Sequence, residues 1–117
     1  MSNDETLLQQ EIRLALGKIP TLRLFRNQVR QLPHPKSGRY VQFGLAKGSS
    51  DLIGFKKVKI TPDMVGKEIA QFVSIEIKTN KNKPTQIQKN WLNYIHESGG
   101  ISGVARSIKD ALNILSL

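Results

Sequence analysis

The sequence predicts a single α/β domain with the element order α-β-β-β-α-β-α, a mixed sheet flanked by helices. Residues 72–79 alternate polar and apolar side chains, which is the period of a strand buried on one face. Residues 3–18 and 85–98 repeat apolar side chains at the spacing of amphipathic helices. Short apolar segments bounded by glycine, proline and serine lie between and after these stretches, as expected for the remaining strands.

The first predicted helix determines which of two acidic side chains points inward. Its apolar stripe has five members: Leu8, Ile12, Ala15, Leu16 and Ile19. Ser2-Asn3-Asp4-Glu5 fits a capping box at the start of the helix. At 100° per residue, Glu5 lies within about 40° of the centre of the stripe, whereas Glu11 lies about 90° away. We therefore expect Glu5 to point toward the rest of the fold, with a plain capping role as its alternative, and Glu11 to be a solvated flank residue.

Three short strands are expected after this helix, at residues 22–25, 40–43 and 51–55. Residues 30–39 contain two prolines and a glycine, which predicts a basic loop. Gly44–Ser50 is a turn of small residues, which would let a metal or phosphate approach the backbone. Asp51 follows at the start of a strand, where capping the turn is its alternative role. Residues 56–60 are expected to continue the hairpin, before a connector with one helical turn begun at Pro62.

The strand at 72–79 places Glu76 and Lys78 on one face. Two residues of strand separate them by about 7 Å, close enough to serve one bound metal and one water. Charged side chains near the end of an apolar strand are costly unless they are paired, metal-bound or open to a cleft. A functional site or a solvated stripe on a wet sheet face would both explain the pair.

The C-terminal third begins with a basic loop at 80–84. Thr85 is expected to cap a helix running to about Ser98, with Gln88 at the edge of its apolar stripe. Its buried face is predicted to contain Ile87, Trp91, Tyr94 and Ile95. A glycine pair should end this helix, followed by a strand at 101–106 and a short helix through Ile114.

Composition limits the class of protein and the kind of metal. The chain has 117 residues, 38% of them hydrophobic, which fits one domain spanning residues 1–117. It has no cysteine and two histidines, so any metal should be a hard ion held by carboxylates. No export signal or membrane-spanning stretch is evident, and a cytoplasmic location is expected. Eighteen Lys and Arg against nine Asp and Glu give a net charge of +9, which favours a polyanionic partner such as nucleic acid, although ribosomal and membrane-surface proteins share this signature.

Several separate motifs resemble those of one family. They are Gly48-Ser49-Ser50-Asp51-Leu52-Ile53-Gly54, Glu76-Ile77-Lys78, Gln88-Lys89-Asn90-Trp91 and Gly99-Gly100. In this order and spacing they resemble the VRR-NUC domain of the PD-(D/E)XK nuclease superfamily. Glu5 and Leu24-Phe25-Arg26-Asn27 extend the resemblance over essentially the whole chain. Ser50 stands where the superfamily name has proline, at a position that varies in this group.

The resemblance implies a restriction-endonuclease-like core and a Mg²⁺- or Mn²⁺-dependent endonuclease that hydrolyses phosphodiester bonds in DNA. Asp51 and Glu76 would ligate the metal, together with the backbone carbonyl of Ile77. Glu5 would bind the metal through water, or would bind a second metal directly. A divalent cation at such a site activates water and neutralises developing charge.

The resemblance also assigns the remaining site residues. Lys78 would position the attacking water or stabilise the charge on the phosphoryl group, and Gln88 would orient Lys78 or a phosphate oxygen. Seven residues are candidates for DNA contact: Arg26, Asn27, Arg30, Arg39, Lys47, Lys81 and Lys83.

The chain looks like a stand-alone bacterial or phage version of the domain, whose members resemble Holliday junction resolvases of DNA repair. This predicts a homodimer that cuts four-way junctions, with apolar residues of the 56–71 segment as a candidate interface: Ile60, Met64, Val65 and Ile69. The alternatives are a flap or nicking nuclease, a non-catalytic DNA-binding accessory protein and a basic RNA-associated structural protein.

Overall fold

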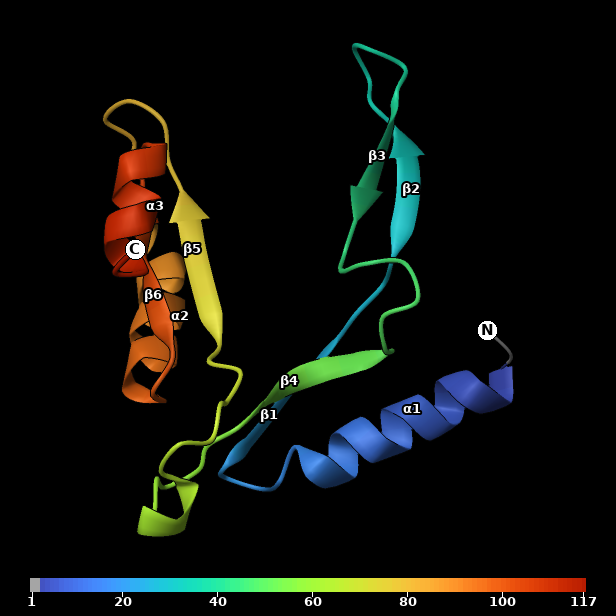
Figure 1. Cartoon of the computed structure of the whole chain (residues 1–117). Helices are drawn as coiled ribbons and strands as arrows, with labels where there is room; N and C mark the ends of the chain where they lie inside the picture. The colour runs from blue at the N-terminus through green and yellow to red at the C-terminus, as the bar shows by residue number, and fades with distance from the viewer. Residues whose placement is uncertain (1–2) are drawn as a thin grey trace. The chain divides into compact units, whose positions relative to one another are not determined.

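The structure is a computed structural model that describes residues 3–117 (Figure 1). Its helices are α1 (Asn3–Leu16), α2 (Gln86–Glu97) and α3 (Ile108–Ile114), with a short 3₁₀ helix η1 (Pro62–Met64). Its strands are β1 (Leu22–Arg26), β2 (Arg30–Pro33), β3 (Tyr40–Phe43), β4 (Leu52–Lys56), β5 (Val73–Ile77) and β6 (Ile101–Ala105). The predicted mixed α/β class is confirmed, and so is the helical turn begun at Pro62. Ser2, part of the expected capping box, lies outside the described residues.

The chain divides into two compact units, Met1–Val58 and Lys59–Leu117, and each is described by itself. The prediction of one domain over residues 1–117 stays a prediction. Within the described residues, the strands pair as three two-stranded sheets, of which two are antiparallel and one is parallel. No helix between residues 3 and 117 combines the length and apolar character that crossing a membrane requires.

In the N-terminal unit, β1 pairs antiparallel with β4, from Leu22 opposite Lys56 to Arg26 opposite Leu52. Helix α1 lies along this pair (Figure 1). Gly54 lets the two strands approach, because a Cβ atom at this position would overlap the carbonyl oxygen of Arg23. This pairing brings the end of β1 beside the start of β4.

The predicted loop at 30–39 is wrong over its first four residues. Arg30–Pro33 forms β2, which pairs antiparallel with β3, and His34 N–H donates to the carbonyl of Arg39 at 2.7 Å to close the connecting turn. Proline is tolerated here because Pro33 is the last residue of a strand at a sheet edge. The predicted continuation of a hairpin through 56–60 is also wrong, since β4 ends at Lys56 and takes β1 as its partner.

The predicted inward stripe of the first helix is wrong as well. Leu8 and Ile12 are exposed, and between Asp4 and Leu16 the one buried residue is Gln9. A cavity against β1 is lined by three residues of α1 at helical spacing, Gln10, Arg13 and Leu14, and by Gly17 just after the helix. The sequence places leucines on several sides of this helix, so its apolar pattern does not define one face. Glu5 is exposed, as Glu11 is, and is not turned inward within this unit.

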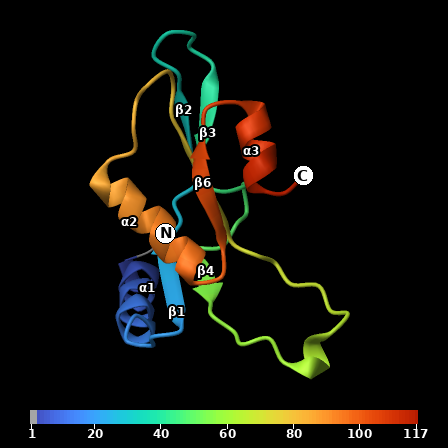
Figure 2. The same cartoon turned by 90° about the vertical axis from the view of Figure 1, so that its left-hand side faces the viewer.

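In the C-terminal unit, β5 and β6 run parallel, from Val73 beside Ile101 to Ile77 beside Ala105. Helix α2 makes the crossover between them, and Figure 2 shows α2 and α3 on opposite sides of β6. Gly103 faces α3, because a Cβ atom there would lie 2.9 Å from the Cδ1 atom of Ile114.

The core of this unit is small. Ile95 of α2 and Ala105 of β6 are buried, and Trp91 and Tyr94 are half-buried, as predicted for the apolar face of α2. Ile87 is 82% exposed, so its predicted burial is wrong. It lies in the first turn of α2, just after the helix leaves the 80–84 loop.

The strand predicted at 72–79 is present as Val73–Ile77, but its expected buried face is only partly formed. Ile75 is half-buried, whereas Val73 and Ile77 are exposed. The opposite face is covered by α2, since the Trp91 Nε1–H donates to Ser74 Oγ at 2.8 Å. Glu76 is two residues after Ser74 and therefore lies on the same face of the strand, the face toward α2.

Candidate functional site

Asp51 lies where a tight turn of the N-terminal unit meets β4. Gly44 begins the turn with φ of +80°, a conformation that favours glycine, and a Cβ atom there would fall against the carbonyl oxygen of Gln28. Asp51 is exposed at a bend directly before Leu52, the first residue of β4. The predicted position of Asp51 between turn and strand is confirmed, and its carboxylate is open to solvent.

Asn27 crosslinks this turn. Its Oδ1 accepts from Leu45 N–H at 3.1 Å, and its Nδ2 donates to Ser49 Oγ at 2.7 Å and to the Ser50 carbonyl at 3.0 Å. Its backbone N–H donates to the carbonyl of Asp51 at 2.9 Å. The sequence suggested Asn27 as a DNA contact, whereas in the structure its amide group bonds within the chain.

Glu76 and Lys78 lie at the carboxyl end of β5, and both are half-buried. They share the strand face that Ser74 presents to α2, as the period of two predicted. Helix α2 runs opposite to β5 because it connects two parallel strands. The N-terminal turn of α2 therefore lies toward the end of β5 that carries these two charges.

The carbonyl of Ile77 is directed to the edge of β5 away from β6. Two bonds set the pattern of the ladder, since Ile101 N–H donates to the carbonyl of Phe72 and Lys78 N–H donates to that of Ala105, at 2.8 and 3.1 Å. The backbone N–H and carbonyl groups of even-numbered residues in this strand therefore bond β6. The backbone groups of odd-numbered residues point to the opposite edge of the strand. The Ile77 oxygen is not taken up by the parallel pair.

Gln88 closes the N-terminus of α2. Its Oε1 accepts from Thr85 N–H at 2.9 Å while its own N–H donates to Thr85 Oγ1 at 3.2 Å, a reciprocal capping box. The acceptor oxygen is therefore used locally, and the Nε2 amide group takes no part in the box. Gln88 is half-buried, in agreement with its predicted place at the edge of the apolar stripe.

The loop that follows Lys78 is held by Arg106, which lies between β6 and α3. Arg106 Nη1 donates to the carbonyl of Asn80 at 2.9 Å, and Asn80 has φ of +51°, in the left-handed region. Arg106 N–H in turn donates to Asp110 Oδ2 at 2.9 Å. Lys81 and Lys83 are exposed on this loop, and Arg106 is a part of the arrangement that sequence reasoning missed.

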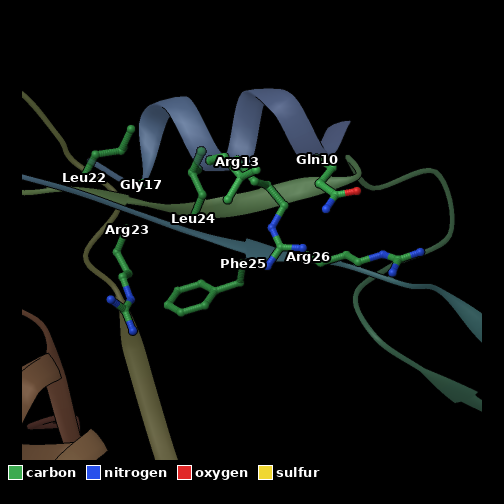
Figure 3. A pocket seen from close by; sticks show the side chains of 9 residues that line it. Gln10, Arg13, Gly17, Leu22, Arg23, Leu24, Phe25 and Arg26 are labelled. Carbon is green, nitrogen blue, oxygen red and sulfur yellow. The ribbon is translucent and has the colours of Figure 1, made fainter. Parts of the chain in front are cut away.

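A basic cavity of about 680 Å³ lies between α1 and β1 (Figure 3). Leu22 and Leu24 are directed toward the helix, and Gln10 and Arg13 are directed from the helix toward the strand (Figure 3). Arg26, a predicted DNA contact, lines this cavity with Arg13, and both are exposed. Arg13 was missed because charge alone does not separate a groove residue from a solvated helix flank.

The other predicted DNA contacts are exposed, as binding requires. They are Arg30, Arg39 and Lys47 in the N-terminal unit and Lys81 and Lys83 in the C-terminal unit. Arg30 lies on β2 and Arg39 in the turn before β3. The basic 30–39 segment is therefore the first strand and the connection of a β2-β3 hairpin, with Arg30 on the strand and Arg39 in the connection.

Asp51 belongs to one unit and Glu76 to the other. Among residues 3–117, no three histidine, aspartate or glutamate side chains come together as a metal site. The proposed donors are two carboxylates and one backbone carbonyl, all oxygen, which is the ligand chemistry that Mg²⁺ and Mn²⁺ prefer. The kind of donor atoms therefore fits either ion.

The described features define a basic, mixed α/β protein with acidic residues at the ends of its strands, the class that includes the restriction-endonuclease-like nucleases. The chain matches the VRR-NUC domain over residues 4–109 and belongs to that family. Its fold is accordingly the restriction-endonuclease-like VRR-NUC fold, and the protein is a nuclease with DNA as its substrate. Comparison with curated proteins and with solved structures gives no match.

Proposed function

We propose that the protein is a Mg²⁺- or Mn²⁺-dependent DNA endonuclease in which Asp51 and Glu76 bind the metal with the carbonyl of Ile77. The observation that carries this proposal is the end of β5. Three consecutive residues there offer a half-buried carboxylate, a carbonyl directed away from the β-ladder and a half-buried ammonium group. These are the groups that metal-assisted hydrolysis of a phosphodiester needs.

Each residue has a distinct task in the reaction. A divalent cation held by Asp51, Glu76 and the Ile77 carbonyl would activate water and neutralise the charge that develops on the phosphoryl group. Lys78 orients the attacking water and stabilises the negative oxygens, because its ammonium group shares a strand face with Glu76. The capping box uses the Oε1 atom of Gln88 and leaves its Nε2 amide group as a donor. This group would bond a phosphate oxygen, or an acceptor that also orients Lys78.

Contact with DNA is proposed to rest on phosphate recognition by exposed cations. The net charge of +9 supplies the attraction, and Arg13 and Arg26 add two guanidinium groups at the cavity between α1 and β1. Arg30, Arg39 and Lys47, with Lys81 and Lys83, would extend this contact. Such contacts position the protein on DNA without reading bases.

The direct test uses the purified chain and a panel of labelled DNAs: duplex, flap, single-stranded and four-way junction. We expect cleavage with Mg²⁺ or Mn²⁺ that stops when EDTA is added. Cleavage that is unchanged in EDTA would contradict the metal-dependent mechanism. Tight DNA binding without any cut on the whole panel would favour the non-catalytic accessory protein.

We further propose that the active species is a homodimer that cuts four-way junctions with paired nicks. Resolving a junction takes two incisions, and two-fold symmetry supplies two equivalent sites. The 59–71 segment of the C-terminal unit supports this proposal, because Ile60, Val65 and Ile69 are 72, 82 and 57% exposed. Apolar side chains gathered on an exposed segment favour association.

Sedimentation at micromolar concentration tests the dimer. The wild-type chain is expected at about twice its 13.1 kDa mass, and Val65→Asp is expected at the monomer mass. Ile87→Asp is the matched control, since Ile87 is equally exposed but lies on α2. A monomer that resolves junctions at nanomolar concentration would overturn the dimer.

A further inference from the structure

The segment that carries Asp51 has little packing to hold it. From Gly44 to Asp51, every residue except Ser49 is exposed, and Ser49 itself is half-buried. A carboxylate on such a segment has a defined position only if hydrogen bonds fix the backbone before it. The described contacts of this turn therefore decide how well Asp51 can serve a metal.

Those contacts converge on Asn27. Its side chain reaches both ends of the turn, with Leu45 at the start and Ser49 and Ser50 at the end, at distances of 2.7 to 3.1 Å. Its backbone N–H fixes the carbonyl of Asp51 at 2.9 Å. Two other bonds act within the turn, from Ser49 N–H to the Ala46 carbonyl and from Gln42 Nε2 to the Leu45 carbonyl, both at 2.9 Å.

The hydrogen bonds that Asn27 makes to both ends of the turn require a side-chain amide group. Leu45 needs an acceptor while Ser50 needs a donor, and a carboxamide offers both on one carbon. The Oδ1 assignment is fixed by its partner, because a backbone N–H cannot accept a hydrogen bond. The side chain is also half-buried, so water competes less for these bonds than at an exposed site.

We infer that Asn27 is a positioning residue for the metal ligand Asp51, holding the Gly44–Asp51 turn in the form that binds a divalent cation. This inference rests on the proposed function, since it assigns Asn27 a role toward the same metal. Asn27 acts through the backbone of the turn and does not itself touch the metal or the DNA.

The test is calorimetric titration of the metal-free chain with Mn²⁺ alone, without DNA. Removing a group that orients a metal ligand typically weakens metal binding about 10- to 100-fold, and Asn27→Ala is expected to raise the Mn²⁺ dissociation constant by that factor. Gln28→Ala is the matched control, because Gln28 is the exposed neighbour of Asn27, and its dissociation constant should stay within about twofold of wild type. Thermal unfolding in EDTA is measured on the same samples.

A second variant covers the case in which Asn27→Ala does not fold. Ser49→Ala removes one partner of the Asn27 amide and leaves the bonds to Leu45 and Ser50, so it should weaken Mn²⁺ binding about fivefold. A lower unfolding temperature with unchanged Mn²⁺ affinity in either folded variant would make Asn27 merely structural and overturn the inference. If the wild-type chain binds no Mn²⁺, the proposed metal-dependent function is contradicted. The role of Asn27 toward a metal is then contradicted as well.

Discussion

The two regions that carry the proposed metal ligands are held by different physical means. Asp51 is exposed beside a turn fixed by the hydrogen bonds of one amide side chain. Glu76 is half-buried on a parallel strand, with α2 on its own face, in a unit whose buried residues include Ile95 and Ala105. A ligand on a turn is positioned by a few directional contacts, whereas a ligand on a strand is positioned by the packing of whole elements.

This difference predicts which substitutions should disturb which ligand. Polar changes around the Gly44–Asp51 turn should alter metal affinity and leave global stability nearly unchanged. Apolar changes in the β5-α2-β6 crossover should lower the stability of the C-terminal unit, and activity should be lost only as that unit unfolds.

Lys78→Met should produce the largest effect on turnover, a loss of about 10²- to 10⁴-fold, since groups that act on the attacking water contribute this much. Mn²⁺ binding should remain, because the lysine is not a ligand. The control is Lys81→Met, on the exposed loop after β5, which should weaken DNA binding and leave turnover at saturating DNA unchanged. Loss of Mn²⁺ binding in Lys78→Met would instead give this residue a structural role.

Ile95→Ala should cost about 2–5 kcal/mol of unfolding free energy, as expected for a fully buried aliphatic side chain. Ile87→Ala on the same helix removes the same atoms from an exposed position and should change stability by no more than about 0.5 kcal/mol. Urea unfolding followed by the fluorescence of the single tryptophan, Trp91 on α2, measures both. Equal losses would refute the structural difference between the two isoleucines.

Arg13→Gln should weaken DNA binding and reduce the slope of log affinity against log salt by about one, as for one lost phosphate contact. Lys18→Gln makes the same charge change just beyond α1, outside the residues that line the cavity. Fluorescence anisotropy from 50 to 200 mM salt, a range in which phosphate contacts dominate the change in affinity, compares the two. Identical slopes for the two variants would show that the cavity is not part of the DNA-binding surface.

Glu5→Gln should have the smallest effect, a loss of cleavage of about tenfold, if Glu5 acts on the metal through water as the family resemblance implies. Glu11→Gln is the control on the same helix. Because both carboxylates are exposed in the N-terminal unit, the helix face gives no reason for a difference. Equal activities would leave Glu5 without a role at the metal.

Local patterns predicted the elements that their own residues specify. Thr85 and Gln88, three apart, mark the start of α2, and the alternation around Glu76 and Lys78 marks β5 and places both charges on one face. The turn before Asp51 was evident from its small residues. In each case the signal and its consequence lie within a few residues.

The features that sequence reasoning missed depend on partners far along the chain. The side chain of Asn27, suggested from the sequence only as a DNA contact, bonds residues 18 to 23 positions away, and Arg106 bonds Asn80 at 26 positions. Neither residue differs in type from an ordinary surface residue. The inward face of α1 was predicted wrongly because leucines lie on several sides of that helix. The contact with β1, and not the apolar pattern, determines which face of α1 points inward. Strand β2 was not predicted because a proline at the end of a strand gives the same sequence signal as a loop.

Asp51 and Glu76 are proposed to bind the metal that cleavage requires, and the cleavage rates of Asp51→Asn and Glu76→Gln with Mg²⁺ test this assignment. Both changes keep the shape of the side chain and remove a ligating charge. Each variant should lose cleavage by at least about 10²-fold, while DNA binding stays intact or improves slightly because less negative charge repels the phosphates. Cutting at the wild-type rate by either variant would contradict the assignment.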